Sequence, residues 1–239
     1  MIAKNKIVYV ITLFTFFIIV NISCSGRMSQ DDPGFERSLY SAMKKFNNGN
    51  YRNAIDDFNR IILNYGGESG IDSVQYYMAL SHFKIGEFFS ASYEFIRLAE
   101  RFPQSNLAEE AYFMDGESYY RISPRYVLDQ KDTHSAIRRY QNYLDLYPGG
   151  KFSEKAVERI SELREKLARK EFEAGELYLK LDQPRAAKVY FSEVINNYYD
   201  TGFYTLSLRR IAQAHKKMNR VAEYEDYMGR YRELTGRDE

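Results

Sequence analysis

One pattern of apolar residues recurs four times in this sequence and constrains the fold more than any other feature. In each copy an alanine is followed by an aromatic residue four positions later, an apolar residue seven positions later and a second aromatic residue eleven positions later. Positions with these spacings share one face of a helix. The four copies begin at Ala54, Ala91, Ala136 and Ala187, and each copy predicts one helix.

A second small residue lies ahead of each copy and indicates a partner helix. These residues are Ala42, Ala79, Gly116 and Gly175. Small side chains let two packed helices approach closely, and the combined pattern resembles the tetratricopeptide repeat. With a degenerate last pair around Ile211 and Ala222, we expect an all-α tetratricopeptide-repeat α-solenoid of about five helical hairpins.

Two enlargements separate this sequence from a regular repeat array. The third hairpin contains an insertion at residues 123–134, which we expect to lengthen its internal loop. Residues 153–169 are charged and periodic, and the same period continues to Lys180. The sequence therefore predicts one long helix at the start of the fourth hairpin.

The first residues have the features of an export signal. Lys4 and Lys6 precede fourteen uncharged residues, 7–20. A membrane-spanning helix needs about 20 apolar residues, whereas the apolar region of a secretory signal is shorter. We therefore expect residues 1–23 to be a lipoprotein signal peptide, the alternative being an uncleaved N-terminal membrane helix.

Cys24 is the only cysteine of the sequence and stands directly after this segment. Its position resembles the lipobox of bacterial lipoproteins, although Asn21 departs from the Leu, Val or Ile usual there. The resemblance implies lipidation of Cys24 and anchoring in outer-membrane lipid on the periplasmic face, since Ser25 replaces the Asp that favours inner-membrane retention. Residues 24–34 are expected to form a flexible tether.

Charge and motif content argue against several function classes. Without Lys4 and Lys6 the chain has nearly equal numbers of basic and acidic residues, which is unlike a nucleic-acid-binding protein. The sequence has no phosphate-binding loop and no nucleophile elbow. Because these motifs are missing, we expect no enzyme activity and no cofactor. We also expect no metal site, since no histidine has a metal-ligand neighbour in the form H-x-x-x-H; the three histidines are His82, His134 and His215.

Several segments together resemble the BamD family of outer-membrane protein assembly lipoproteins, also called YfiO or ComL. They are the repeat junctions at residues 101–105 (RFPQS) and 147–150 (YPGG), and the long charged stretch 159–171. The resemblance covers roughly residues 20–235 and includes the lipobox and the enlarged third repeat. It implies a role in inserting β-barrel proteins into the outer membrane, with two partners: unfolded outer-membrane proteins and the periplasmic domains of a BamA-like insertase.

Repeats one and two (35–104) form the predicted substrate-binding half, and repeat three with its loop insertion (105–150) follows them. Concave positions of the first helices place an aromatic residue beside a polar or basic one in three successive layers. Such pairs suit an extended segment that ends in an aromatic residue and a carboxylate. The candidate peptide-binding residues are Phe46, Asn47, Tyr76, Phe83, Lys84, Tyr120 and Arg121. The alternative is that the aromatics only pack between layers.

Repeats four and five (151–239) form the predicted insertase-docking half. The segment from residue 205 to 237 is locally basic, which suits an acidic partner surface. The candidate docking residues are Arg209, Arg210, Lys216, Lys217 and Arg220. A merely solvated helix face is the alternative here.

Two other functions remain open at this point. The chain could be another periplasmic repeat scaffold that coordinates cell-envelope processes such as constriction. It could also be an envelope enzyme or glycan binder, although no residues are left over for an additional catalytic or sugar-binding domain.

Overall fold

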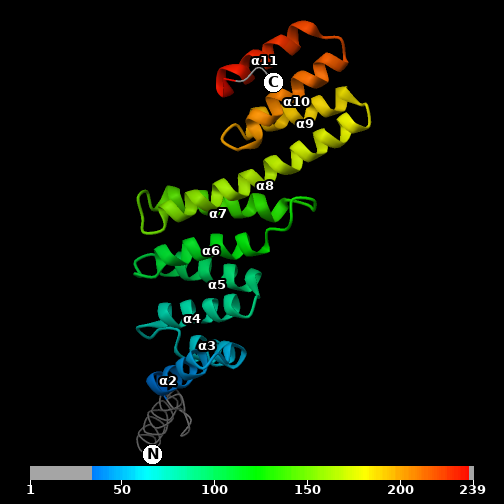
Figure 1. The fold of residues 1–239 in the computed structure, drawn as a ribbon. Helices are drawn as coiled ribbons and strands as arrows, with labels where there is room; N and C mark the ends of the chain where they lie inside the picture. Colours follow the sequence, from blue (N-terminus) through cyan, green and yellow to red (C-terminus); the bar gives the residue numbers. More distant parts are fainter. Residues whose placement is uncertain (1–33, 237–239) are drawn as a thin grey trace, which may run out of the picture. The chain divides into compact units, whose positions relative to one another are not determined.

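The computed structural model describes residues 34–236, which are helical with short connections (Figure 1). The chain divides into two units, residues 1–37 and 38–239. The predicted signal peptide and Cys24 lie outside the described residues. The helices are α2 (Gly34–Asn47), α3 (Tyr51–Tyr65), α4 (Ile71–Lys84), α5 (Phe88–Arg101), α6 (Ala108–Ile122), α7 (Lys131–Leu146), α8 (Ser153–Lys180), α9 (Pro184–Asn197), α10 (Phe203–Lys217) and α11 (Val221–Thr235).

From α3 to α11, each helix packs against the next one along the chain. Figure 1 shows the helices following one another as hairpins in chain order. The pairs α2/α3, α4/α5, α6/α7, α8/α9 and α10/α11 are the five hairpins, so the predicted repeat α-solenoid is confirmed. Within residues 34–236, no helix is long and apolar enough to cross a membrane.

The repeated pattern forms the core of the hairpins. Ala54, Phe58 and Ile61 are at most 2% exposed, and the corresponding residues of the other three copies are fully buried. Removing this much apolar surface from water is the main stabilisation available to each hairpin. Each of the helices α3, α5, α7 and α9 is thus held in place by the burial of one apolar face.

The small residues of the partner helices are buried against that face. Ala42 and Ala79 are fully buried. A Cβ atom on Gly116 would lie 2.7 Å from the Tyr140 ring, and one on Gly175 would lie 2.6 Å from the Phe191 ring. The close approach of paired helices predicted from these small residues is therefore confirmed.

Four of the hairpins turn in the same way. A residue with positive φ follows the first helix, and the next N–H donates to the carbonyl five positions earlier over 2.9–3.0 Å. This is the Schellman arrangement of a helix end. Gly adopts positive φ without strain, and Asp and Asn do so more readily than most residues. The four positions are Gly49 (75°), Gly86 (82°), Asp182 (53°) and Asn219 (57°).

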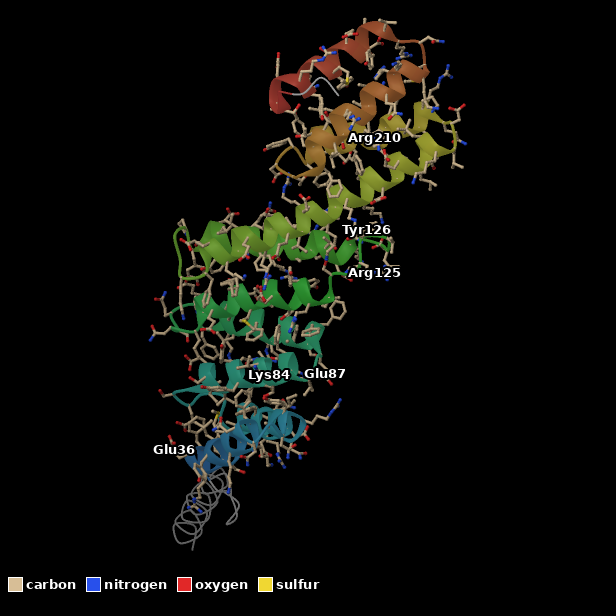
Figure 2. All side chains as sticks on the ribbon, in the orientation of Figure 1. Glu36, Lys84, Glu87, Arg125, Tyr126 and Arg210 are labelled. Atoms are coloured by element: carbon tan, nitrogen blue, oxygen red, sulfur yellow. The ribbon has the colours of Figure 1, made fainter. Side chains whose placement is uncertain are left out.

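The third hairpin has a longer loop, residues 123–130, because α7 begins only at Lys131. The Gln130 amide donates to the carbonyls of Arg125 and Leu128, both over 2.9 Å. From α8, the Lys170 ammonium donates to the Leu128 carbonyl over 2.5 Å. The loop, marked by Arg125 in Figure 2, is thereby bonded to α8.

The predicted long helix is confirmed as α8, with 28 residues. Its first half packs on α6 and α7, and its second half packs on α9 and α10. It is therefore the element shared by the third, fourth and fifth hairpins.

Candidate protein-binding sites

The first candidate peptide-binding aromatic packs between hairpins. The Phe46 ring centroid lies 5.4 Å from that of Tyr51 and 5.2 Å from that of Tyr77, both in edge-to-face geometry. Asn47, the last residue of α2, is exposed. Phe46 thus joins the first hairpin to the second, and only Asn47 presents its side chain to solvent.

Tyr76 links the second hairpin to the third. It is 9% exposed, and its hydroxyl donates to the Glu110 carboxylate over 2.7 Å. Burial, together with the adjacent Glu110 charge, raises the pKa of Tyr76 above its ordinary value. The hydroxyl therefore stays protonated and bonded to α6.

A cluster of two half-buried rings and an exposed guanidinium forms where α4, α5 and α6 meet. The rings of Phe83 and Phe88 are 5.2 Å apart, edge to face. The Arg121 guanidinium lies 5.8 Å from the Phe83 centroid and 5.9 Å from that of Phe88, within the range of a cation–π contact. Lys84 is exposed beside Phe83, and Figure 2 shows it next to the α4–α5 turn.

This aromatic–arginine cluster (Phe83, Phe88 and Arg121) combines two predicted residues with one that sequence reasoning did not select. Phe88 begins α5 directly after the turn at Gly86. An aromatic residue on each side of a tight turn was the signal that could have identified it, since the two side chains emerge at the same end of the hairpin.

Tyr120 belongs to a different set of contacts, although it precedes Arg121. Its hydroxyl donates to Glu162 of α8 over 2.8 Å, and the Arg159 guanidinium lies 4.2 Å from its ring centroid. Arg159 also donates to Glu117 and Glu162, each over 2.9 Å. Burial and then the bond to Glu162 raise the pKa of Tyr120. Tyr120 therefore joins the third hairpin to α8.

The candidate docking residues gather at a hollow between α10 and α11. This basic hollow has a volume of about 600 Å³ and is lined by Arg209, Arg210, Gln213, Lys216, Lys217, Tyr224 and Met228. Arg210, labelled in Figure 2, and three other predicted residues are thus brought together. The fifth predicted residue, Arg220, lines a neighbouring hollow instead.

Two of the four cations are neutralised by α8 and the turn that follows it. Arg210 lies 2.8 Å from Glu176, and Lys217 lies 2.6 Å from Asp182. The hydrogen bond from Lys217 lowers the pKa of Asp182. Arg209 and Lys216 form no ion pair within residues 34–236, so they supply the uncompensated charge of the hollow.

In the part of the chain that the structure describes, no group of three or more His, Cys, Asp or Glu side chains comes together to hold a metal ion. Of the three histidines, His82 lies 2.8 Å from Glu87, and His215 is buried.

Three curated proteins similar to this chain are each named outer membrane protein assembly factor BamD. The Rickettsia prowazekii (strain Madrid E) protein is 24% identical over 177 residues, which cover 74% of this chain and 70% of the relative. The Caulobacter vibrioides protein is 22% identical, with coverage of 80% and 65%, and the Pasteurella multocida protein is 20% identical, with coverage of 86% and 84%.

Similar solved structures include the TPR2AB-domain:pHSP90 complex of yeast Sti1. It has a TM-score of 0.48 and 15% identity, and the match covers 84% of this chain and 78% of that one. A thermophilic TPR protein of Thermus thermophilus has a TM-score of 0.36 and 16% identity, with coverage of 86% and 93%.

A protein-family model gives the broadest classification. The model of YfiO, described as an outer membrane lipoprotein, matches residues 35–228, which is most of the chain and extends from α2 into α11. The chain therefore belongs to the YfiO family of outer membrane lipoproteins.

Proposed function

We propose that this chain is a non-enzymatic, lipid-anchored component of the machinery that assembles β-barrel proteins in the outer membrane. The observation that carries the proposal is the family match over residues 35–228, joined by relatives that are named outer membrane protein assembly factors. Stacked helical hairpins suit this role because they expose extended surfaces that bind polypeptides.

The aromatic–arginine cluster is the proposed site for unfolded outer-membrane proteins. Phe83 and Phe88 offer apolar faces to an aromatic side chain, and Arg121 with exposed Lys84 offers donors to a terminal carboxylate. Aromatic and Arg residues contribute most of the binding energy at many interfaces. A segment ending in an aromatic residue and a free carboxylate matches both features.

This site is tested with a barrel-protein C-terminal peptide and the full chain. Lys84→Ala combined with Arg121→Ala should weaken binding about tenfold or more, because charge-assisted hydrogen bonds to the carboxylate are lost. Arg185→Ala, at an exposed position of α9, is the control. Equal affinity of the double variant and the native chain would exclude this site.

The basic hollow is the proposed docking surface for the insertase. Arg209 and Lys216 carry its uncompensated charge. An acidic patch on the partner would complement them, and such complementarity steers encounter and orientation.

Affinity purification of the lipidated protein from membranes tests the partner. We expect a large β-barrel protein with periplasmic domains to copurify with the native chain and to be lost from Arg209→Glu/Lys216→Glu. Arg138→Glu, at an exposed site on α7, should retain it. Recovery of cell-division or cell-wall proteins in its place would favour the envelope scaffold over barrel assembly.

The anchor is proposed to be the acylated Cys24, which places the chain on the periplasmic face of the outer membrane. Several acyl chains on one residue give stable attachment where a single chain gives only marginal binding. Cys24→Ser should remove the protein from the outer-membrane fraction on cell fractionation, because the acyl chains are lost. Unchanged outer-membrane association of that variant would argue for another anchor.

A further inference from the structure

A second hollow, of about 390 Å³, opens where α9, the end of α10 and the start of α11 meet. It is separate from the basic hollow in both position and charge. Its volume lies within the range of roughly 300–1,000 Å³ that is usual for ligand pockets. The residues that determine its chemistry are Lys188, His215, Arg220, Glu223, Asp226 and Tyr227.

His215 forms the buried wall of this hollow. It is 2% exposed, and its ring lies against Tyr227 with centroids 5.5 Å apart and planes at 24°. Neither ring nitrogen has a hydrogen-bond partner among the described residues. Buried polar groups are nearly always hydrogen-bonded, so a neutral imidazole here lacks both a donor for one nitrogen and an acceptor for the other.

The charged residues around His215 are of both signs. Arg220 lies 3.6 Å from Glu223 and is partly compensated. Lys188 on α9 and Asp226 on α11 have no ion-pair partner within residues 34–236. The hollow therefore combines one unpaired cation, one unpaired carboxylate and an imidazole that lacks hydrogen bonds.

This charge pattern disfavours ligands of a single sign. Glu223 and Asp226 would repel a phosphate or a strongly acidic segment, and Lys188 and Arg220 would repel a basic one. A ligand that carries both signs pairs with Lys188 and Asp226 at once.

We propose that this hollow binds a segment of a partner polypeptide in which an acidic and a basic side chain lie close together in sequence. The acidic side chain pairs with Lys188, and the basic one pairs with Asp226. The inference rests on the proposed function insofar as it assigns a polypeptide as the ligand.

The full chain is titrated with the peptide acetyl-Ala-Glu-Gln-Lys-Ala-amide and observed by NMR at His215 and Tyr227. Two comparison peptides replace either Glu or Lys by Gln. The doubly charged peptide should bind about fivefold tighter than either comparison peptide and shift both residues, since it satisfies both unpaired charges. Equal binding of all three peptides, or no shift at His215, overturns the proposal.

Variants locate the site. Lys188→Glu and Asp226→Lys should each weaken binding at least about fivefold, because one attractive pair becomes repulsive. Ala222→Trp, at an exposed lining position, should block entry without altering the core. Lys180→Glu, exposed on α8, is the control for net charge. Binding that survives Ala222→Trp in the folded chain also overturns the proposal.

Two measurements on the native chain, the peptide titration and the copurification, separate this inference from the proposed function. If the insertase still copurifies but the doubly charged peptide does not bind, the hollow proposal fails and barrel assembly stands. If the peptide binds as expected but no barrel protein copurifies, the hollow proposal stands and barrel assembly fails.

Discussion

Glycine at two helix positions lets an aromatic ring lie directly on a neighbouring backbone. Gly116 faces Tyr140 and Gly175 faces Phe191, with room for a hydrogen but not for a methyl group. Both rings are fully buried, and the Tyr140 hydroxyl is bonded to Glu117 over 2.6 Å. The rings therefore cannot move aside without disturbing the hairpin core.

Gly116→Ala should destabilise the chain by roughly 1–3 kcal/mol, as an overpacked core does, despite the better helix propensity of Ala. Urea unfolding followed by circular dichroism measures the change. Gly229→Ala is the matched control, because a Cβ there meets nothing within 4 Å. It should stabilise the chain by about 0.5–1 kcal/mol, and a stabilised Gly116→Ala would contradict the close approach.

Acidification should destabilise the fold through His215. Burial lowers the pKa of His215 below 6.5, so the unfolded chain binds this proton more tightly than the folded chain. The neutral, buried His215 then contributes fully to stability above about pH 6.5, the ordinary pKa of the unfolded state. This contribution is lost as the pH falls below that value. Urea midpoints of the native chain and His215→Gln between about pH 7 and 5 should show a shallower decline in the variant. Parallel profiles would mean that His215 titrates alike in both states.

The residues of the candidate site differ in how far the sequence could predict them. The four cations of the basic hollow all lie on one helix, α10. Their spacing in the sequence therefore predicts that their side chains lie near one another. The partners of Tyr76 and Tyr120 are 34 and 42 residues away, on helices of other hairpins. A local pattern identifies a side chain on a face, but it does not show which distant carboxylate will bond to it.

Among the helices, α8 was the easiest to predict from the sequence. Its charged, periodic sequence contains no Gly or Pro before Gly175, and nothing interrupts the helix up to Lys180. The conformation of the loop 123–130 was harder to predict. Lys166 and Lys170 of α8 donate to the Ser123 hydroxyl and the Leu128 carbonyl of the loop, and such polar contacts leave no apolar pattern in the sequence.

Arg164 joins the middle of α8 to the connection between α9 and α10. Its guanidinium donates to both Asp200 oxygens, over 2.6 and 2.7 Å, and to the Asn197 carbonyl over 2.7 Å. Arg164→Ala should cost about 1–2 kcal/mol, because a bidentate, charge-assisted pair is lost at a partly exposed site. Amides of residues 197–203 should lose protection from hydrogen exchange.

Two variants control for charge and for surface pairing. Arg164→Lys retains the charge but not the planar fork, and it should recover little of the protection. Lys155→Ala removes an exposed pair with Glu158 and should change stability by less than about 0.5 kcal/mol. Full protection in Arg164→Lys would show that charge alone holds the connection.

In the stack of hairpins as a whole, the buried apolar residues form separate clusters. One contains Phe95 with residues of α4, α5 and α6, and another contains Phe191 with residues of α9, α10 and α11. In repeat proteins each unit is stabilised by its own packing and by its immediate neighbours. The repeat pattern predicts this organisation, because each copy supplies its own buried face.

Phe95→Ala and Phe191→Ala should therefore have local effects in opposite halves of the stack. Both rings are fully buried at equivalent repeat positions, so each truncation should cost about 3–5 kcal/mol. Hydrogen exchange should show lost protection in α4, α5 and α6 for Phe95→Ala, with α9, α10 and α11 retained, and the reverse for Phe191→Ala. Since the two variants remove the same side chain, each is the control for the other. Uniform loss of protection in both would instead require the hairpins to unfold as a single cooperative unit, with α8 transmitting the damage between halves.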